Sequence, residues 1–441
     1  MMKLFSTAGL LLIAGTALAQ PSPDMLAQAA KSLQPKLVEW RRHIHQNPEL
    51  GNREVKTAAY VAAHLKKLGL EVRENIAVTG VVGILRGGKP GPVVALRADM
   101  DALPVKERVD VPFKSTVTAE YLGQTVPVMH ACGHDSHVSI LMGTAEMLAA
   151  MKEQVPGTVV FIFQPAEEGP PGTEEGGAPL MIKEGVLDNP KVEAIFGLHI
   201  NSLTPVGSIK YKPGGTMASS DWFTVKVKGK QTHGSQPWSG VDPIMVSAAI
   251  IDGFQTIVSR EMELTKAPVV ITVGKIQSGV RSNIIPEEAV MEGTIRTLEP
   301  AMQKQVHERM KAMAAQIAAA HGATAEVSID TKTLVTYNNP ELTRQMVPSL
   351  QKAAGAANVY ETEWTTGAED FSFFSDKVPG LFFFLGGMPA GKTPKEAAPH
   401  HTPDFYIDDS MLDVGVKAFA NLVFDYAALK AAPAKPMGKR K

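Results

Sequence analysis

The chain has a single cysteine, Cys132, in 441 residues, so no intrachain disulfide is possible. Neither charge is in excess, because 44 Lys and Arg stand against 45 Asp and Glu and the net charge is -1. This balance gives no indication of binding to nucleic acid or to an anionic membrane surface. After the N-terminal segment, no apolar run reaches the roughly 20 residues that a transmembrane helix needs. The composition, 44% hydrophobic and 20% charged, is typical of a globular protein of two or three domains.

The two ends of the chain differ from the rest. Residues 1–19 have a short basic start, an apolar stretch and a small-residue site at Ala17-Leu18-Ala19. This pattern predicts a secretory signal cut between Ala19 and Gln20, and hence a mature protein that is exported, periplasmic or secreted, with no membrane contact after cleavage. Residues 431–441 are rich in Pro, Ala and Lys and are predicted to have no fixed structure.

The lone cysteine lies in a cluster of other side chains that bind metals. Residues 130–137 read His-Ala-Cys-Gly-His-Asp-Ser-His, and Gln164-Pro165-Ala166-Glu167-Glu168 adds two adjacent carboxylates. Thiolate, imidazole and carboxylate are the ligands of zinc and similar divalent ions. In an exported protein a free thiol is open to oxidation unless it is buried or bound to metal. A metal site is therefore favoured over a polar loop.

Hydrophobic patterns predict an α/β fold in which helices flank a central sheet. Helical spacing runs from Asp24 to Leu70 and again over 138–151, and continuous apolar strands are predicted at 81–85, 93–96 and 159–163. Helices that alternate with buried strands are typical of an α/β layer fold. The main domain is expected to comprise residues 20–215 and 332–430.

An insertion is predicted at residues 216–331. Its first strand, 222–229, alternates apolar and polar residues, and helix, two strands, helix and a last strand follow at 243–260, 269–276, 289–297, 300–321 and 325–331. The order β-α-β-β-α-β is that of an α+β ferredoxin-like unit. We therefore expect a satellite domain inserted into the main one.

Ligand-like side chains follow several predicted strands. Asp99 and Asp101 come after the strand at 93–96, Glu167 and Glu168 after 159–163, and His199 after the apolar residues 194–196. Open α/β sheets place their sites at the carboxyl ends of their strands, so these side chains are expected to meet there. The adjacent pair His400-His401 lies close to the C-terminus.

These motifs resemble those of the co-catalytic metallopeptidase superfamily of aminoacylases, hippurate hydrolases and glutamate carboxypeptidases. The most similar branch is that of amidohydrolases of N-acyl-amino acids, auxin–amino acid conjugates included. The matching motifs are RADMDALP, MHACGHDSH, QPAEEG, GGAPLMI, NIIP with GTIRT, GAEDFSFF and HHTPDF, in order from Arg97 to Phe405. They cover nearly the whole chain after the signal segment.

The resemblance implies a role for each matching residue. Cys132 takes the position that bridges two metal ions, Glu167 takes that of the general base, and Asp99 that of an acid orienting a ligand. His233 matches an inserted-domain histidine that reaches a neighbouring site and polarises the scissile carbonyl, although Gln231 and Thr232 replace the usual preceding glycines. Asn283 and Arg296 match substrate-binding residues, the arginine facing a carboxylate. The remaining metal ligands are His134, Glu168, His199 and His401.

The implied chemistry is hydrolysis of a linear amide by a metal-activated water. Two divalent ions can lower the pKa of a shared water toward neutrality, and Glu167 would then move the proton to the leaving amine. The thiolate favours Zn²⁺, and Mn²⁺, Co²⁺ and Ni²⁺ are alternatives.

The expected substrate is a small N-acyl-L-amino acid with a hydrophobic or aromatic amino acid. N-aroyl-phenylalanine amides of the ochratoxin type, such as ochratoxin A, are candidates. Two alternatives stay open: a dipeptidase or carboxypeptidase, and a non-enzymatic binding protein that closes on an amino-acid conjugate. The satellite domain's exposed strand edge predicts a homodimer or a larger even homo-oligomer.

Overall fold

A computed structural model describes residues 20–432. The predicted signal segment therefore lies outside the described residues, and so does the predicted tail beyond Ala432. The final helix extends to Ala431, one residue into the segment predicted to lack fixed structure.

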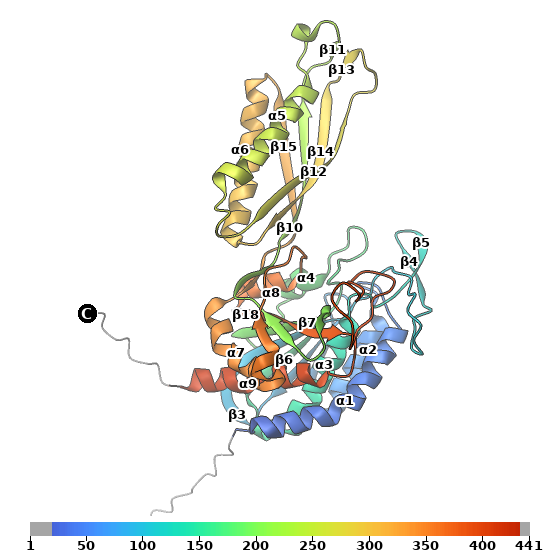
Figure 1. The fold of residues 1–441 in the computed structure, drawn as a ribbon, viewed down its shortest axis with the longest axis vertical. Coiled ribbons are helices and arrows are strands. Elements are labelled where there is room, and N and C mark those ends of the chain that lie inside the picture. Colours follow the sequence, from blue (N-terminus) through green and yellow to red (C-terminus); the bar gives the residue numbers. More distant parts are fainter. Residues whose placement is uncertain (1–19, 433–441) are drawn as a thin grey trace, which may run out of the picture.

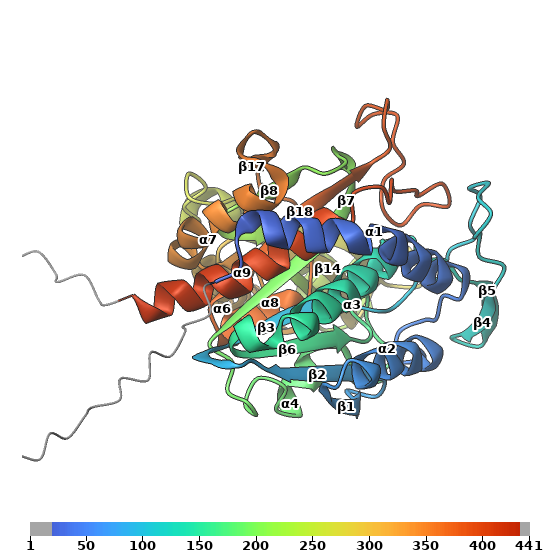
Figure 2. The ribbon, with the colours of Figure 1, turned by 90° about the horizontal axis from the view of Figure 1, so that it is seen from below.

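The main domain is built on an eight-stranded mixed sheet (Figures 1 and 2). In spatial order the strands are β1 (Glu71–Ile76), β2 (Gly80–Arg86), β6 (Pro156–Gln164), β3 (Lys89–Asp99), β7 (Ala194–Pro205), β18 (Gly380–Met388), β8 (Ile209–Tyr211) and β17 (Val359–Glu361). The pairs β3–β6, β3–β7 and β7–β18 are parallel, whereas β1–β2 and β2–β6 are antiparallel.

Helices cover both faces of this sheet, as the apolar strands predict. Along β6, Val159 and Phe161 pack into the core of one face, and Val160 and Ile162 pack into the core of the other. The first face carries α1 (Pro23–Gln46), α2 (Val55–Lys67), α3 (His134–Ala150), α7 (Pro340–Ala354) and α9 (Asp413–Ala431), and the second carries α4 (Gly177–Lys183) and α8 (Phe371–Lys377). Short elements are β4 (Thr118–Tyr121), β5 (Gln124–Pro127), η1 (Lys152–Gln154) and η4 (Ala356–Asn358).

The satellite domain consists of the elements β10 (Ser220–Lys228), α5 (Pro243–Thr256), η3 (Ile257–Glu261, a π-helical turn), β12 (Val269–Ser278), β14 (Glu288–Thr297), α6 (Pro300–Ala320) and β15 (Thr324–Thr333). Its four strands form an antiparallel sheet in the order β12-β14-β10-β15. Phe223, Val225 and Val227 of β10 pack against α5 and α6, and the alternate residues face away from them. This is the predicted ferredoxin-like arrangement.

The two connections to the main domain lie side by side, because β9 (Gly214–Met217) pairs with β16 (Thr336–Asn338). Figure 1 shows the satellite sheet projecting from the main domain. At its far end is the small pair β11 (Thr232–His233) and β13 (Ile284–Ile285), with η2 (Pro237–Ser239) beside it. Within residues 20–432, no helix has both the length and the apolar character needed to cross a membrane.

Candidate metal centre

Three neighbouring strands bring most of the predicted site residues together. Asp99 is the last residue of β3, and Glu167 and Glu168 follow the end of β6 at Gln164. His199 was expected to follow a strand, but it lies within β7 (Ala194–Pro205). β7 continues past His199 since β18 pairs with it as far as Pro205.

The segment 132–134 joins this strand edge to the start of α3. Gly133 has a φ of 93°, and a Cβ there would lie 2.3 Å from Cγ2 of the buried Ile200. Glycine is therefore required at this bend. The residues on either side of it, Cys132 and His134, each have a ligand atom within 4.8 Å of one of Glu168.

Replacing Gly133 by Ala should lower the free energy of unfolding by about 1–3 kcal/mol and reduce the bound metal. Gly123→Ala is the matched control, because Gly123 has a φ of 77° but nothing within 4 Å of the added Cβ. Thermal unfolding and elemental analysis would measure both effects. Equal loss of stability in the two variants, with full metal content in each, would show that crowding against Ile200 is unimportant.

Sulfur, nitrogen and oxygen atoms converge around Cys132. Its Sγ lies 3.3 Å from Nε2 of His199 and 3.3 Å from Nε2 of His401. Oε1 of Glu168 lies 2.9 Å from Nε2 of His401. His401 has a φ of 64°, a strained backbone conformation of the kind found at functional sites.

His134 presents a free nitrogen to the same place. Its Nδ1 lies 3.2 Å from Oδ1 of Asp101, whereas its buried Nε2 has no hydrogen-bond partner among the described residues. Burial lowers the pKa of His134, but the carboxylates of Asp99 and Asp101 outweigh it and raise the pKa to about 10. Such a nitrogen, surrounded by negative charge, fits a cation-binding position.

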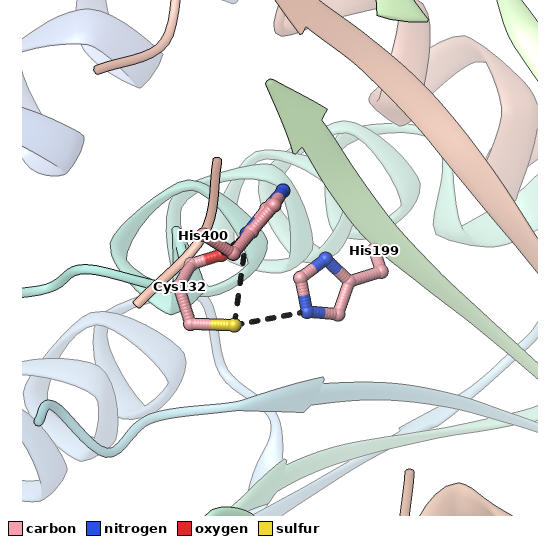
Figure 3. A group of neighbouring side chains, drawn as sticks. All are labelled: Cys132, His199 and His400. Atoms are coloured by element: carbon pink, nitrogen blue, oxygen red, sulfur yellow. Dashed lines mark hydrogen bonds between the residues drawn. The ribbon is translucent and has the colours of Figure 1, made fainter. Parts of the chain in front are cut away.

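The adjacent His400 and the nearby His137 lack a free nitrogen. Nδ1 of His400 lies 3.1 Å from the carbonyl oxygen of Cys132, and its Nε2 accepts from the Ser202 N–H. Figure 3 shows His400 beside Cys132 and His199. Nδ1 of His137 lies 2.5 Å from Oδ1 of Asp99, and its Nε2 accepts from the Ile200 N–H. These partners favour His401 over His400 as a ligand.

The donor atoms form neighbouring groups that share residues. Within the described part of the chain, the ligand atoms of Cys132, Glu168 and His401 lie within 4.8 Å of one another, and so do those of His134, Glu167 and Glu168 and those of Cys132, His199 and His400. Sulfur, imidazole and carboxylate in such adjacent groups fit a pair of divalent ions.

Glu167 is placed beside these groups and is nearly buried. Its Oε1 accepts a 3.3 Å hydrogen bond from the Asp370 N–H, and its Oε2 lies 3.8 Å from Nε2 of His134. Burial, followed by the negative charges of Glu369 and Glu168, raises the pKa of Glu167 well above its usual value. The carboxyl group thus has a high proton affinity, as a proton-transferring group needs.

A fully buried arginine pairs with the carboxylates next to Glu167. Arg97 pairs with Asp99 at 2.6 Å, Glu369 at 2.8 Å and Asp370 at 2.9 Å. Arg97, Glu369 and Asp370 had no predicted role, although the motifs RADMDALP and GAEDFSFF contain them. Asp99 was predicted to orient a ligand, but Oδ1 of Asp101 lies closer to Nδ1 of His134, at 3.2 Å, than Oδ1 of Asp99 does, at 3.8 Å.

The three satellite residues lie in two places. Arg296 is on β14 and lines a cleft that also contains Glu167 and Glu168. His233 and Asn283 lie together at the far end of the satellite, where the Gly234 N–H donates to the Asn283 carbonyl oxygen at 2.8 Å. The fold therefore does not bring these two residues to the metal centre of their own chain.

Two cavities meet at Glu167 and Glu168. The smaller, of about 350 Å³, is lined by Met217 and Phe384 and by four of the candidate ligands: Cys132, Glu168, His199 and His401. The larger, of about 750 Å³, lies between the segment 166–179 and the outer face of the satellite sheet. An extended substrate could place one arm in each cavity and its scissile bond between them.

Known proteins share this architecture. Residues 95–425 match peptidase family M20/M25/M40. The chain is 40% identical to thermostable carboxypeptidase 2 of Saccharolobus solfataricus, over 92% of this chain and 98% of the relative. It is 35% identical to IAA-amino acid hydrolase ILR1-like 2 of Arabidopsis thaliana, over 94% of this chain and 90% of the relative. The solved structure of the Bacillus subtilis YXEP protein, a dinuclear metal-binding peptidase of family M20, is 33% identical with a TM-score of 0.74, over 91% of this chain and 99% of that chain.

The chain belongs to peptidase family M20/M25/M40, so the family resemblance seen in its motifs is confirmed. It is a metal-dependent hydrolase of linear amides with the α/β fold and the satellite domain of that family. The predicted fold class and enzyme class are therefore confirmed.

Proposed function

We propose that this enzyme hydrolyses N-acyl-L-amino acids with a hydrophobic or aromatic amino acid. The observation that carries the proposal is the position of Arg296 in the larger cavity, which also contains Glu167 and Glu168. An N-acyl-amino acid has one carboxylate next to its amide, so a cation on one wall and a general base on another match its two functional groups. Bulky N-aroyl-phenylalanine amides such as ochratoxin A are candidates for the same reason.

Arg296 is well suited to bind that carboxylate. Its guanidinium makes no ion pair with any residue of 20–432, and its hydrogen bond within that range is to the Ser219 carbonyl oxygen at 3.3 Å. A guanidinium offers paired donors that match a carboxylate. The amino-acid arm is therefore assigned to the larger cavity and the acyl arm to the smaller one, beside Met217 and Phe384.

In this proposal Glu167 is the proton carrier. Cys132, His134, Glu168, His199 and His401 would hold the divalent ions, which would supply a water of lowered pKa and positive charge beside the scissile carbonyl. Glu167 takes a proton from the attacking water as oxygen bonds to the carbonyl carbon. It then delivers the proton to the nitrogen as the carbon–nitrogen bond breaks, which releases a carboxylic acid and a free amino acid.

A dipeptidase or carboxypeptidase is the second candidate, since one relative is named a carboxypeptidase. A dipeptide has a free ammonium group, which needs an acidic partner. Apart from Glu167 and Glu168, the acidic residue lining the smaller cavity is Glu369, which is buried and paired with Arg97. Acyl substrates therefore fit this cavity better than free dipeptides do. Release of phenylalanine from N-acetyl-phenylalanine, ochratoxin A and a panel of dipeptides would separate the two functions.

We propose Zn²⁺ as the resident metal, because a thiolate and three imidazoles favour it. Removing the metal with a chelator should abolish turnover, and Zn²⁺ should restore it. Elemental analysis beside the assay would show whether metal content follows activity. Stronger recovery with Mn²⁺, Co²⁺ or Ni²⁺ would change the metal assignment, and full activity after complete metal removal would contradict the mechanism.

Two further proposals concern assembly and location. A homodimer or larger even assembly is supported by the exposed strand β12 at the satellite edge and by the remote position of His233. Export is supported by the signal pattern of residues 1–19. Mass measurement in solution tests the first, and N-terminal sequencing of the native protein, with Gln20 expected first, tests the second.

A further inference from the structure

An exposed indole lies on the outer face of the satellite sheet. Trp222 of β10 is 57% exposed, and its strand partners are Thr294 on β14 and Asp330 on β15. Alternation along β10 directs Phe223 into the satellite core and Trp222 away from it. A large apolar side chain in this position contributes little to the satellite core.

The indole shares its face of the sheet with Arg296. Asp221 pairs with Ile295, so Arg296 is opposite Ser220, one step along the same face from Trp222. Such diagonal neighbours on adjacent strands are within reach of long and aromatic side chains. Two cations line the larger cavity, and one of them, Lys332, is paired with Asp330 at 2.5 Å. The other, Arg296, has no carboxylate partner among residues 20–432.

Trp222 and Arg296 both line the larger cavity, which also contains Glu167 and Glu168. The opposite wall is the segment 166–179, in which four glycines lie among larger residues such as Thr173 and Glu174. The cavity of about 750 Å³ lies between the indole and this segment, which carries the general base.

We propose that Trp222 selects the side chain of the leaving amino acid, favouring aromatic residues. This inference rests on the proposed function, in which Arg296 binds the carboxylate of the same amino acid. The α-carbon is bonded to both the carboxylate and the side chain, so fixing the carboxylate at Arg296 places the side chain near the neighbouring indole. A phenyl ring can pack against the indole in a stacked or edge-to-face contact, whereas a methyl group gains little from it.

The test compares N-acetyl-phenylalanine with N-acetyl-alanine. Trp222→Ala should lower kcat/KM for the phenylalanine substrate roughly tenfold, mainly through KM, and change that for the alanine substrate less than about twofold. Trp222→Phe should keep most of the preference. Thr224→Ala, on the same strand and the same outer face but farther from Arg296, is the matched control and should keep all of it.

Two kinetic outcomes would overturn the inference: an equal loss on both substrates, which indicates a structural role, or no loss on either. A shift of the Trp222→Ala variant to a smaller assembly would show instead that the indole packs against a second copy of the chain.

A binding measurement separates this inference from the proposed function. N-acetyl-phenylalanine should change the tryptophan fluorescence of the metal-loaded Glu167→Gln protein, and the added Trp222→Phe substitution should remove that change. If the wild-type enzyme cleaves neither acyl substrate, the proposed function fails. The fluorescence titration then still decides whether Trp222 contacts an aromatic amino acid.

Discussion

Glu167→Gln is expected to abolish turnover while the protein keeps its metal. Moving a proton during amide hydrolysis contributes about 10²–10⁴-fold to the rate, and glutamine cannot perform this step. Glu167 is close to the ligand groups, with Oε2 3.8 Å from Nε2 of His134, but Glu168 carries the carboxylate that contacts His401. Initial rates on N-acetyl-phenylalanine and elemental analysis of the same sample would measure both properties.

Two neighbouring glutamates provide the controls for this experiment. Glu168→Gln should lose metal as well as activity, because it weakens a ligand. Glu175→Gln should change neither, because Glu175 is an exposed residue whose side chain pairs with Lys183 at 2.8 Å. A Glu167→Gln protein with normal turnover would exclude the mechanism. A wild-type protein that binds the substrate tightly without forming product would favour the binding-protein alternative.

Most of the fold could be predicted from periodicity. The strands at β6 and β3 are continuous apolar runs because both of their faces are covered, and the alternation in β10 reflects a sheet covered on one face only. The short strands β8 and β17 were not predicted, because three residues give no period and their pairing depends on β18. His199 was placed after a strand for the same reason: the pairing of β7 with β18 cannot be read from local sequence.

The site was predictable to the extent that ligand types cluster in the sequence. Cys132, His134 and the pair Glu167-Glu168 could be found from residue type, and the strand ends indicated that they meet. The ion-pair network of Arg97 could not be found in this way, because Glu369 and Asp370 are 272 and 273 positions away in the sequence and reach Arg97 only through the fold. The sequence also offered no reason to single out Trp222, since an aromatic residue in an alternating strand is usually interpreted as a core residue.

His233→Ala should lower kcat by about 10²–10³-fold although the residue lies far from the metal centre of its own chain. Nδ1 of His233 accepts the Ser235 N–H at 3.1 Å, so the ring proton is on Nε2, where it can be donated. The side chain is exposed at the end of the satellite remote from the main sheet (Figure 1). In the proposed homo-oligomer, such a donor would stabilise a developing oxyanion in the site of another subunit.

A hybrid dimer tests this directly. Glu167→Gln and His233→Ala chains carrying different tags would be co-expressed, and dimers containing one chain of each kind would be isolated with both tags. If His233 acts across the interface, the site with an intact Glu167 receives an intact His233 from its partner, and the hybrid regains about half of the wild-type activity. Were His233 to act within its own chain, both sites of the hybrid would be defective and it would be as inactive as its parents. A sharp monomer mass for the active wild-type enzyme would also contradict the shared site, because a lone chain keeps His233 away from its Cys132 cluster.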